Sequence, residues 1–200
     1  EAAAYIQTIT DKFDALQKQV VAKTSVELTI NGADGKRAVR NAETNLGDLC
    51  ADAYRILLGA DIAFVNGGGV RADIDAGDIT YEDIINVHPF GNEACLVEVT
   101  GQQIKDALEL GSAAYPGESG GFLQVSGLTY TINADIPSSV VKNDKSEFVK
   151  VDGAYRVSDI MVGGQPLDVS KTYTLASHNY MLKQGGDGYA MFGTDNVKLL

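Results

Sequence analysis

The hydrophobic pattern of this chain changes character near residue 122, and this change limits the folds that the chain can adopt. Before that point, short apolar runs at residues 61–65 and 95–99 lie next to segments in which apolar residues recur every three or four positions, which indicates strands next to helices. After it, apolar and polar residues alternate over short runs separated by Gly and Asp, which is typical of antiparallel strands. We therefore expect an α+β fold of α/β type, with mixed sheets, flanking helices and an antiparallel second half.

The boundaries of the elements follow from local signals. Asn45 is the expected N-cap of a helix that ends at Gly59, Thr80 begins a short helix that Pro89 ends, and Thr100 begins a helix that runs to Gly111. The stretch 135–145 is polar and is expected to be a mobile excursion. Strands are expected at residues 25–30, 61–65, 95–99, 122–125, 128–132, 148–151, 156–162 and 172–176.

Size and charge exclude several classes of protein. A chain of 200 residues can bury one sizeable core. Its 27 acidic residues outnumber 16 basic ones, giving a net charge of −11, which argues against binding a nucleic acid polymer. An anionic ligand would therefore need a local basic patch. The sequence has no apolar run near the ~20 residues that a membrane span requires, so we expect none.

The first residues predict an amphipathic helix. Ile6, Ile9, Phe13, Leu16 and Val20 recur at steps of three and four. We expect residues 1–22 to form a connector helix whose apolar face packs on the rest of the chain, and 23–200 to form one domain. The chain begins without Met, so it is expected to be a piece of a larger protein.

Cysteine and histidine offer little for catalysis. Cys50 and Cys95 each lie in an apolar run and are expected to be buried and reduced. His88 and His178 have no neighbouring Cys pair and no metal-ligand spacing; a backbone-bonded His at a strand end is the expected role of His178. No Gly-x-Ser-x-Gly nucleophile motif is present. We expect neither a catalytic residue nor a metal site in this chain.

Two glycine-rich stretches are candidates for ligand binding. Gly67, Gly68 and Gly69 follow an apolar run, so a ligand could approach backbone N–H groups, with the forked cation of Arg71 nearby. A plain turn explains these glycines equally well. Asp187 lies within Gly185-Gly186-Asp187-Gly188, where an exposed carboxylate could bind a sugar diol, although an ordinary glycine turn would look the same.

Two further side chains have alternative explanations. Phe90 lies between Pro89 and Gly91 and could stack on a planar ring or pack in the core. Arg40 lies in the polar stretch before the helix at 45, where a solvated surface charge is the simplest explanation.

Taken together, these segments resemble the C-terminal domain of the 5′-nucleotidase, UDP-sugar hydrolase and 2′,3′-cyclic phosphodiesterase family. The resemblance covers residues 37–190 or so, and its motifs occur in the family's order. They are Arg40-x-x-Glu43-x-Asn45-Leu46-Gly47-Asp48-Leu49, Asn66-Gly67-Gly68-Gly69-Val70-Arg71, Gly77-Asp78-Ile79-Thr80, Pro89-Phe90-Gly91-Asn92, Thr100-Gly101, Gly121 to Leu128 and Gly185-Gly186-Asp187-Gly188-Tyr189.

The resemblance implies a role for each candidate residue. Arg40 and Arg71 would contact the phosphate or other polar groups of a nucleotide. Asn66 and the glycines 67–69 would line the base and ribose site. Phe90 would stack on the base, and Asp187 would accept hydrogen bonds from the ribose hydroxyls.

One position departs from the family pattern. Many members have a second base-stacking aromatic residue six positions before the Asp of the glycine tip, where this chain has Met181 with Tyr180 beside it. Met181 and Tyr180 are therefore secondary candidates for the site. A looser preference for the base is expected.

The resemblance also implies a larger enzyme. Two divalent metal ions and the catalytic residues would belong to an N-terminal metallophosphoesterase domain in cis, so the chain alone would not hydrolyse nucleotides. Family members are usually periplasmic, extracellular or attached to the cell wall. The substrate stays open between nucleoside monophosphates, cyclic nucleotides and UDP-sugars. The alternatives are a nucleoside-binding or adhesion module without enzyme activity, and a domain in which the glycine loops and Phe90 are only structural.

Overall fold

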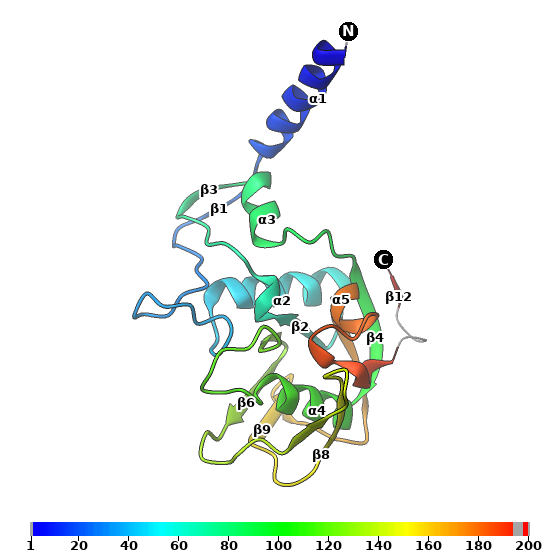
Figure 1. The fold of residues 1–200 in the computed structure, drawn as a ribbon. Helices are drawn as coiled ribbons and strands as arrows, with labels where there is room; N and C mark the ends of the chain where they lie inside the picture. Colours follow the sequence, from blue (N-terminus) through cyan, green and yellow to red (C-terminus); the bar gives the residue numbers. More distant parts are fainter. Residues whose placement is uncertain (1, 194–197, 200) are drawn as a thin grey trace.

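A five-stranded mixed sheet forms the centre of the molecule (Figure 1). The computed structural model describes residues 2–193 and 198–199. The strand order is β12-β4-β11-β2-β5, and only β11 and β2 run parallel to each other. The strands are β2 (Ile62–Asn66), β4 (Ala94–Thr100), β5 (Leu123–Ser126), β11 (Thr172–His178) and β12 (Lys198–Leu199).

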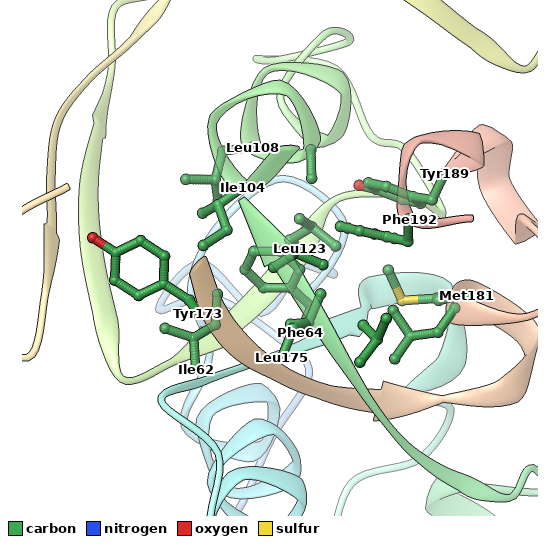
Figure 2. Close-up of a cluster of buried hydrophobic side chains, with 14 of the residues drawn as sticks. Ile62, Phe64, Ile104, Leu108, Leu123, Tyr173, Leu175, Met181, Tyr189 and Phe192 are labelled. Atoms are coloured by element: carbon green, nitrogen blue, oxygen red, sulfur yellow. The ribbon is translucent and has the colours of Figure 1, made fainter. Parts of the chain in front are cut away.

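The two faces of this sheet bury different side chains because neighbouring residues of a strand point to opposite faces. Ile62 and Phe64 of β2 belong to the larger core, beside helix α4 (Gly101–Gly111), and this cluster is drawn in Figure 2. Val65 belongs to a second core with Leu46 of helix α2 (Asn45–Leu58). Helices thus cover both faces, which is why β2 is buried along its whole length.

The second half of the chain is antiparallel, as expected. A three-stranded sheet has the order β10-β9-β6, and β7 pairs with β8 as a separate hairpin. These strands are β6 (Leu128–Ile132), β7 (Val140–Lys142), β8 (Phe148–Val151), β9 (Val157–Val162) and β10 (Gln165–Pro166). The expected excursion at 135–145 therefore contains a strand, because Val140 pairs with Val151 and packs against the larger core.

Helix starts follow the capping signals closely. The hydroxyls of Thr80 and Thr100 accept hydrogen bonds from the third helical residue, and both form complete capping boxes, for α3 (Tyr81–Val87) and α4. The expected cap of α2 is wrong by one residue: Thr44 is the N-cap, and it accepts from the N–H of Gly47. Asn45 instead bonds the backbone of Glu27 and Thr29 through its side chain.

The N-terminal prediction is wrong in two respects. Helix α1 (Ala2–Gln17) ends five residues early, and Val20–Thr24 form strand β1, which pairs with β3 (Gly77–Thr80). The β-branched pair Val20-Val21 favours a strand and gains backbone partners there. Residues 25–30 form no strand; Leu28 makes one isolated bridge to Ile74.

Helix α1 extends away from the rest of the molecule (Figure 1). Phe13 is 51% exposed and Leu16 is 44% exposed, so the expected packing of the apolar face is wrong for these residues. The side chains of Ile6 and Ile9 lie outside the described residues. Cys50 and Cys95 are buried free thiols, as expected. Within the described ranges, no helix is both long and apolar enough to span a membrane.

Short helices complete the chain near the sheet. They are η1 (Gly67–Gly69), α5 (Asn179–Leu182), η2 (Gly186–Gly188) and η3 (Ala190–Phe192). η1 follows β2 directly, and α5 follows β11 directly. Because β2 and β11 are parallel neighbours, both turns leave the sheet at the same edge, which is where ligands bind in sheets of this kind.

Candidate functional site

A cavity of about 350 Å³ lies at this edge of the central sheet, within the size range of small-molecule sites. Loops from distant parts of the sequence contribute to it. The lining residues are Arg40, Asn66, Gly68, Gly69, Phe90, Asn92, Gly120, Tyr180 and Asp187. Seven of the expected site residues therefore meet here, whereas Gly67, Arg71 and Met181 do not line the cavity.

The triple glycine packs more tightly than the sequence suggests. A Cβ on Gly67 would overlap the carbonyl oxygen of Val39. The N–H of Gly67 donates to Phe122 O at 2.7 Å, and that of Gly68 to Gly120 O at 2.8 Å. These two N–H groups are thus already paired, and the expectation that a ligand binds them is wrong. The glycines bring the loop close to its neighbours instead.

Asp187 lies at the tip of η2 in the left-handed region, with φ 55°, which Asp tolerates better than most residues. A Cβ on Gly186 would overlap the ring of Tyr180, so only glycine fits there. The Asp187 carboxylate accepts from Asn66 Nδ2 at 2.7 Å and from the Tyr180 hydroxyl at 3.2 Å. Two neutral donors therefore hold the carboxylate in place inside the cavity.

Tyr180 and Met181 have opposite environments. Both lie on α5, where consecutive side chains are about 100° apart. Tyr180 lines the cavity, and burial and Asp187 raise the pKa of its hydroxyl. Met181 is fully buried in the larger core, which also contains Leu175 and Phe192 (Figure 2). Met181 is therefore a core residue, and Tyr180 is the aromatic residue that this segment contributes to the cavity.

Phe90 is an exposed ring beside a cation. Its side chain is 59% exposed, so the alternative that Phe90 is part of the core is wrong. The guanidinium carbon of Arg71 lies 5.8 Å from the ring centroid, within range of a cation–π contact. An Nη of Arg71 also donates to Gly68 O at 3.4 Å. Arg71 is therefore a neighbour of Phe90 but is not among the residues that line the cavity.

Arg40 is half-buried, which excludes the simple explanation of a solvated surface charge. Its carbonyl accepts from Ser119 N at 2.9 Å, which ties it to the loop that carries Gly120. Its Nε is buried and has no hydrogen-bond partner in the described part of the chain. A buried, charged donor without a partner is costly. Because Arg40 also lines the cavity, its guanidinium is the cation that an anionic ligand would meet there.

His178, the last residue of β11, lies directly behind the lining residues. It is 1% exposed, and its Nε2 lies 3.2 Å from Asn66 Oδ1. The expected bond of this ring to backbone is therefore wrong, since its partner is a side chain. Burial, with a smaller effect from His88, lowers the pKa of His178 to about 4, so the ring is neutral at pH 7.

Three contributors were missed from the sequence. Asn92 belongs to the Pro89-Phe90-Gly91-Asn92 motif, so a polar side chain next to the candidate ring was a usable signal. His178 precedes Tyr180 by two residues, but nothing local indicates its contact with Asn66. Gly120 has no local signal either, because it reaches the cavity only through the loop that follows α4.

The side chains that line the cavity are of types that bind a ligand. They combine an exposed aromatic face, a fixed carboxylate and a cation with an unpartnered donor, which suit a planar ring, a diol and an anion respectively. Among the residues that the structure describes, no three His, Cys, Asp or Glu side chains are close enough to hold one metal ion together. The described residues therefore do not fit a metal centre.

Comparison with known proteins gives a consistent result. A family model described as "5'-nucleotidase, C-terminal domain" matches residues 20–194. The trifunctional nucleotide phosphoesterase protein YfkN of Bacillus subtilis is 36% identical over 96% of this chain. Protein UshA of Escherichia coli is 33% identical over 84% of it. The chain spans only 12% of the length of YfkN and 27% of that of UshA.

Solved structures agree with this match. The crystal structure of a 5′-nucleotidase precursor from Thermus thermophilus superposes with a TM-score of 0.73 and 32% identity, over all of this chain and 37% of that one. A putative 5′-nucleotidase from Staphylococcus aureus, at 21% identity and a TM-score of 0.72, shares the fold. Fold, sequence and the order of the motifs therefore agree, and the chain belongs to the family of 5′-nucleotidase C-terminal domains.

Proposed function

We propose that the cavity binds the nucleoside part of a nucleotide and that the chain is the substrate-recognition domain of a metal-dependent nucleotide phosphohydrolase. The observation that carries this proposal is the Asp187 carboxylate, held by Asn66 and Tyr180 in a cavity that also contains the exposed ring of Phe90. A carboxylate beside an aromatic face suits a ribose attached to a base.

The acceptor capacity of Asp187 supports a diol as its ligand. A carboxylate offers about four lone-pair positions. Asn66 Nδ2 and the Tyr180 hydroxyl occupy two of them, which leaves about two for the 2′- and 3′-hydroxyls of a ribose.

The remaining expected residues fit the other parts of a nucleotide. Phe90 stacks on the base, and the Arg71 guanidinium next to its ring stays near enough to contact polar groups of the ligand. Arg40, which lines the cavity, contacts the phosphate or another anionic group. Asn66, Gly68 and Gly69 form the wall between them, while Gly67 supports that wall from behind.

Catalysis is assigned to another part of the protein. The relatives are described as nucleotide phosphoesterases or 5′-nucleotidases, and this chain covers only part of each. We propose that an N-terminal metallophosphoesterase domain in cis holds two divalent metal ions and cleaves the phosphoester. A periplasmic, extracellular or cell-wall location is proposed with it.

The cavity suits several classes of nucleotide. Nucleoside monophosphates, cyclic nucleotides and UDP-sugars all contain the base and ribose that the cavity suits. Met181 lies in the core. The aromatic ring that its segment brings to the cavity is that of Tyr180, which is stacked on His178 and bonded to Asp187 through its hydroxyl. We propose that purine and pyrimidine nucleotides bind with similar affinities.

Calorimetric titration of the chain with adenosine and AMP tests the proposal. Phe90→Ala is expected to weaken binding of both by roughly 5- to 150-fold, because base–aromatic stacking contributes about 1–3 kcal/mol. Asp187→Asn keeps a residue that tolerates the left-handed conformation but removes the charge. It is expected to weaken the binding of adenosine and to leave the affinity for 2′,3′-dideoxyadenosine unchanged.

Matched controls come from side chains outside the cavity. Tyr81→Ala removes an exposed aromatic ring from α3, and Asp75→Asn neutralises an exposed carboxylate; neither is expected to change affinity. Equal binding by Phe90→Ala and the unsubstituted chain would refute the proposal. The chain alone is expected to release no phosphate from AMP. A complete polypeptide that binds AMP without cleaving it would favour a non-catalytic binding module.

A further inference from the structure

The structure contains a line of polar contacts that starts behind the cavity and ends at its carboxylate. His178 itself does not line the cavity. His178 Nε2 lies 3.2 Å from Asn66 Oδ1, and Asn66 Nδ2 lies 2.7 Å from Asp187 Oδ2. The side chain of Asn66, which is 4% exposed, is thus the link between a buried imidazole and the proposed ribose ligand.

The chemistry of these groups permits one arrangement of protons. The carboxylate of Asp187 only accepts, so the NH₂ end of the Asn66 amide must face it. The oxygen of that amide then faces His178, and Nε2 must carry the proton that it accepts. His178 Nδ1 is left as the unprotonated nitrogen, and it has no hydrogen-bond partner in the described part of the chain.

Packing around the amide and the ring limits other arrangements. A Cβ on Gly69 would lie 2.8 Å from Asn66 Oδ1, and one on Gly68 would lie 3.4 Å from Asn66 Nδ2. The His178 ring is stacked at 6.1 Å on Tyr180 and meets the edge of Tyr54 at 5.9 Å. The glycines thus make room for this amide, and two aromatic rings hold the imidazole in its place.

A reversed amide would work against the site. It would place the Asn66 oxygen against the Asp187 carboxylate, so that two acceptors faced each other and the 2.7 Å hydrogen bond was lost. The donor that prevents this reversal is His178 Nε2–H. A neutral donor is sufficient for the purpose, and burial keeps the ring neutral.

We propose that His178 is a positioning residue for ribose recognition: its Nε2–H orients the amide of Asn66, and that amide holds Asp187 in the position that binds the ribose diol. This inference rests on the proposed function and adds to it a specificity determinant outside the cavity. It assigns diol selectivity to the three residues together. Base stacking, which depends on Phe90 across the cavity, is independent of them.

The test compares adenosine with 2′,3′-dideoxyadenosine by calorimetric titration of the 200-residue chain. The unsubstituted chain is expected to prefer adenosine. His178→Leu is expected to reduce that preference about tenfold or more, the loss that corresponds to one hydrogen bond to a charged group. His178→Gln, whose Nε2 can donate from a similar position, is expected to restore it. The affinity for dideoxyadenosine is expected to stay unchanged in both.

A control variant separates positioning from general damage. Leu182→Met alters a buried core residue on the same short helix and conserves its volume, so it is expected to leave the preference intact. If His178→Leu and Leu182→Met keep the same preference for adenosine, the positioning role is wrong. If His178→Leu does not fold, the measurement of the ring tautomer described next still decides.

The tautomer can be measured without any ligand. A ¹⁵N correlation spectrum of the histidine rings is expected to show His178 protonated at Nε2 and unprotonated at Nδ1, with His88→Gln used to assign the signals. A proton on Nδ1 would overturn the inference. A chain that does not distinguish adenosine from dideoxyadenosine would overturn the proposed function, whereas selectivity combined with the wrong tautomer would overturn only the role of His178.

Discussion

Acidification is expected to destabilise this chain, with the largest contribution of its two histidines coming from the buried His178. The ring is 1% exposed, and burial lowers its pKa from 6.5 to about 4. Between these two values the unfolded chain binds a proton that the folded chain does not bind, so the free energy of unfolding falls as the pH falls. The effect begins near pH 6.5 and is complete below about pH 4.

The magnitude follows from the two pKa values. At pH 5 an unfolded histidine is almost fully protonated, whereas His178 is roughly one-tenth protonated. The difference corresponds to about 2 kcal/mol of unfolding free energy lost between pH 7 and pH 5, since each pKa unit is worth about 1.36 kcal/mol. This is a large part of the ~5–15 kcal/mol that is typical of a domain.

Urea unfolding at pH 7 and pH 5 measures this loss. His178→Gln has no proton to gain, so its loss over the same interval is expected to be about 2 kcal/mol smaller than that of the unsubstituted chain. The comparison uses only the change with pH, so a different stability of the variant at pH 7 does not affect it. His88→Gln serves as the control and is expected to keep most of the His178 contribution, because burial is the larger cause of the lowered pKa. An equal pH dependence of His178→Gln and the unsubstituted chain would refute the reasoning.

Two further predictions concern other buried or half-buried charges. Burial, Glu43 and Asp52 raise the pKa of Asp48 to about 6. The contribution of Asp48 to stability is therefore present below about pH 4 and is lost as the pH rises through 6. Asp48→Asn is expected to stabilise the chain at pH 8, and thermal unfolding that shows no gain would contradict this. Arg156 is 4% exposed and donates to four carbonyl oxygens, those of Ser112, Ala113, Tyr115 and Ile136. Arg156→Met is expected to cost about 3–5 kcal/mol in urea unfolding, because these acceptors and the nearby buried Glu109 lose their cation; a loss below about 1 kcal/mol would mean that water replaces it.

Much of the fold was predictable from short stretches of sequence. The capping boxes that begin α3 and α4 involve residues three positions apart, so the signal and the structure that it specifies are equally local. The same holds for the alternating strands after residue 122. The expected strand at 25–30 failed because Val20–Thr24 pairs with Gly77–Thr80, more than fifty residues away.

The candidate site was also predictable only in part from the sequence. The sequence indicated Arg40, Asn66, Phe90 and Asp187, whose residue types and glycine neighbours suit a nucleotide, and these residues do meet in one cavity. It could not separate Tyr180 from Met181. That choice depends on the short helix α5, which turns Met181 into the core and leaves Tyr180 at the cavity.

By itself, the sequence determined the α+β class, the starts of α3 and α4, the family and most of the residue types in the cavity. These follow from hydrophobic periodicity, capping and glycine positions, which act over a few residues. Only the tertiary structure decided that Gly67 and Gly68 pair with the backbone, that Gly120 reaches the cavity and that His178 contacts Asn66 across 112 positions. Such contacts depend on how parallel strands β2 and β11 place their ends side by side, and no local pattern in the chain encodes that placement.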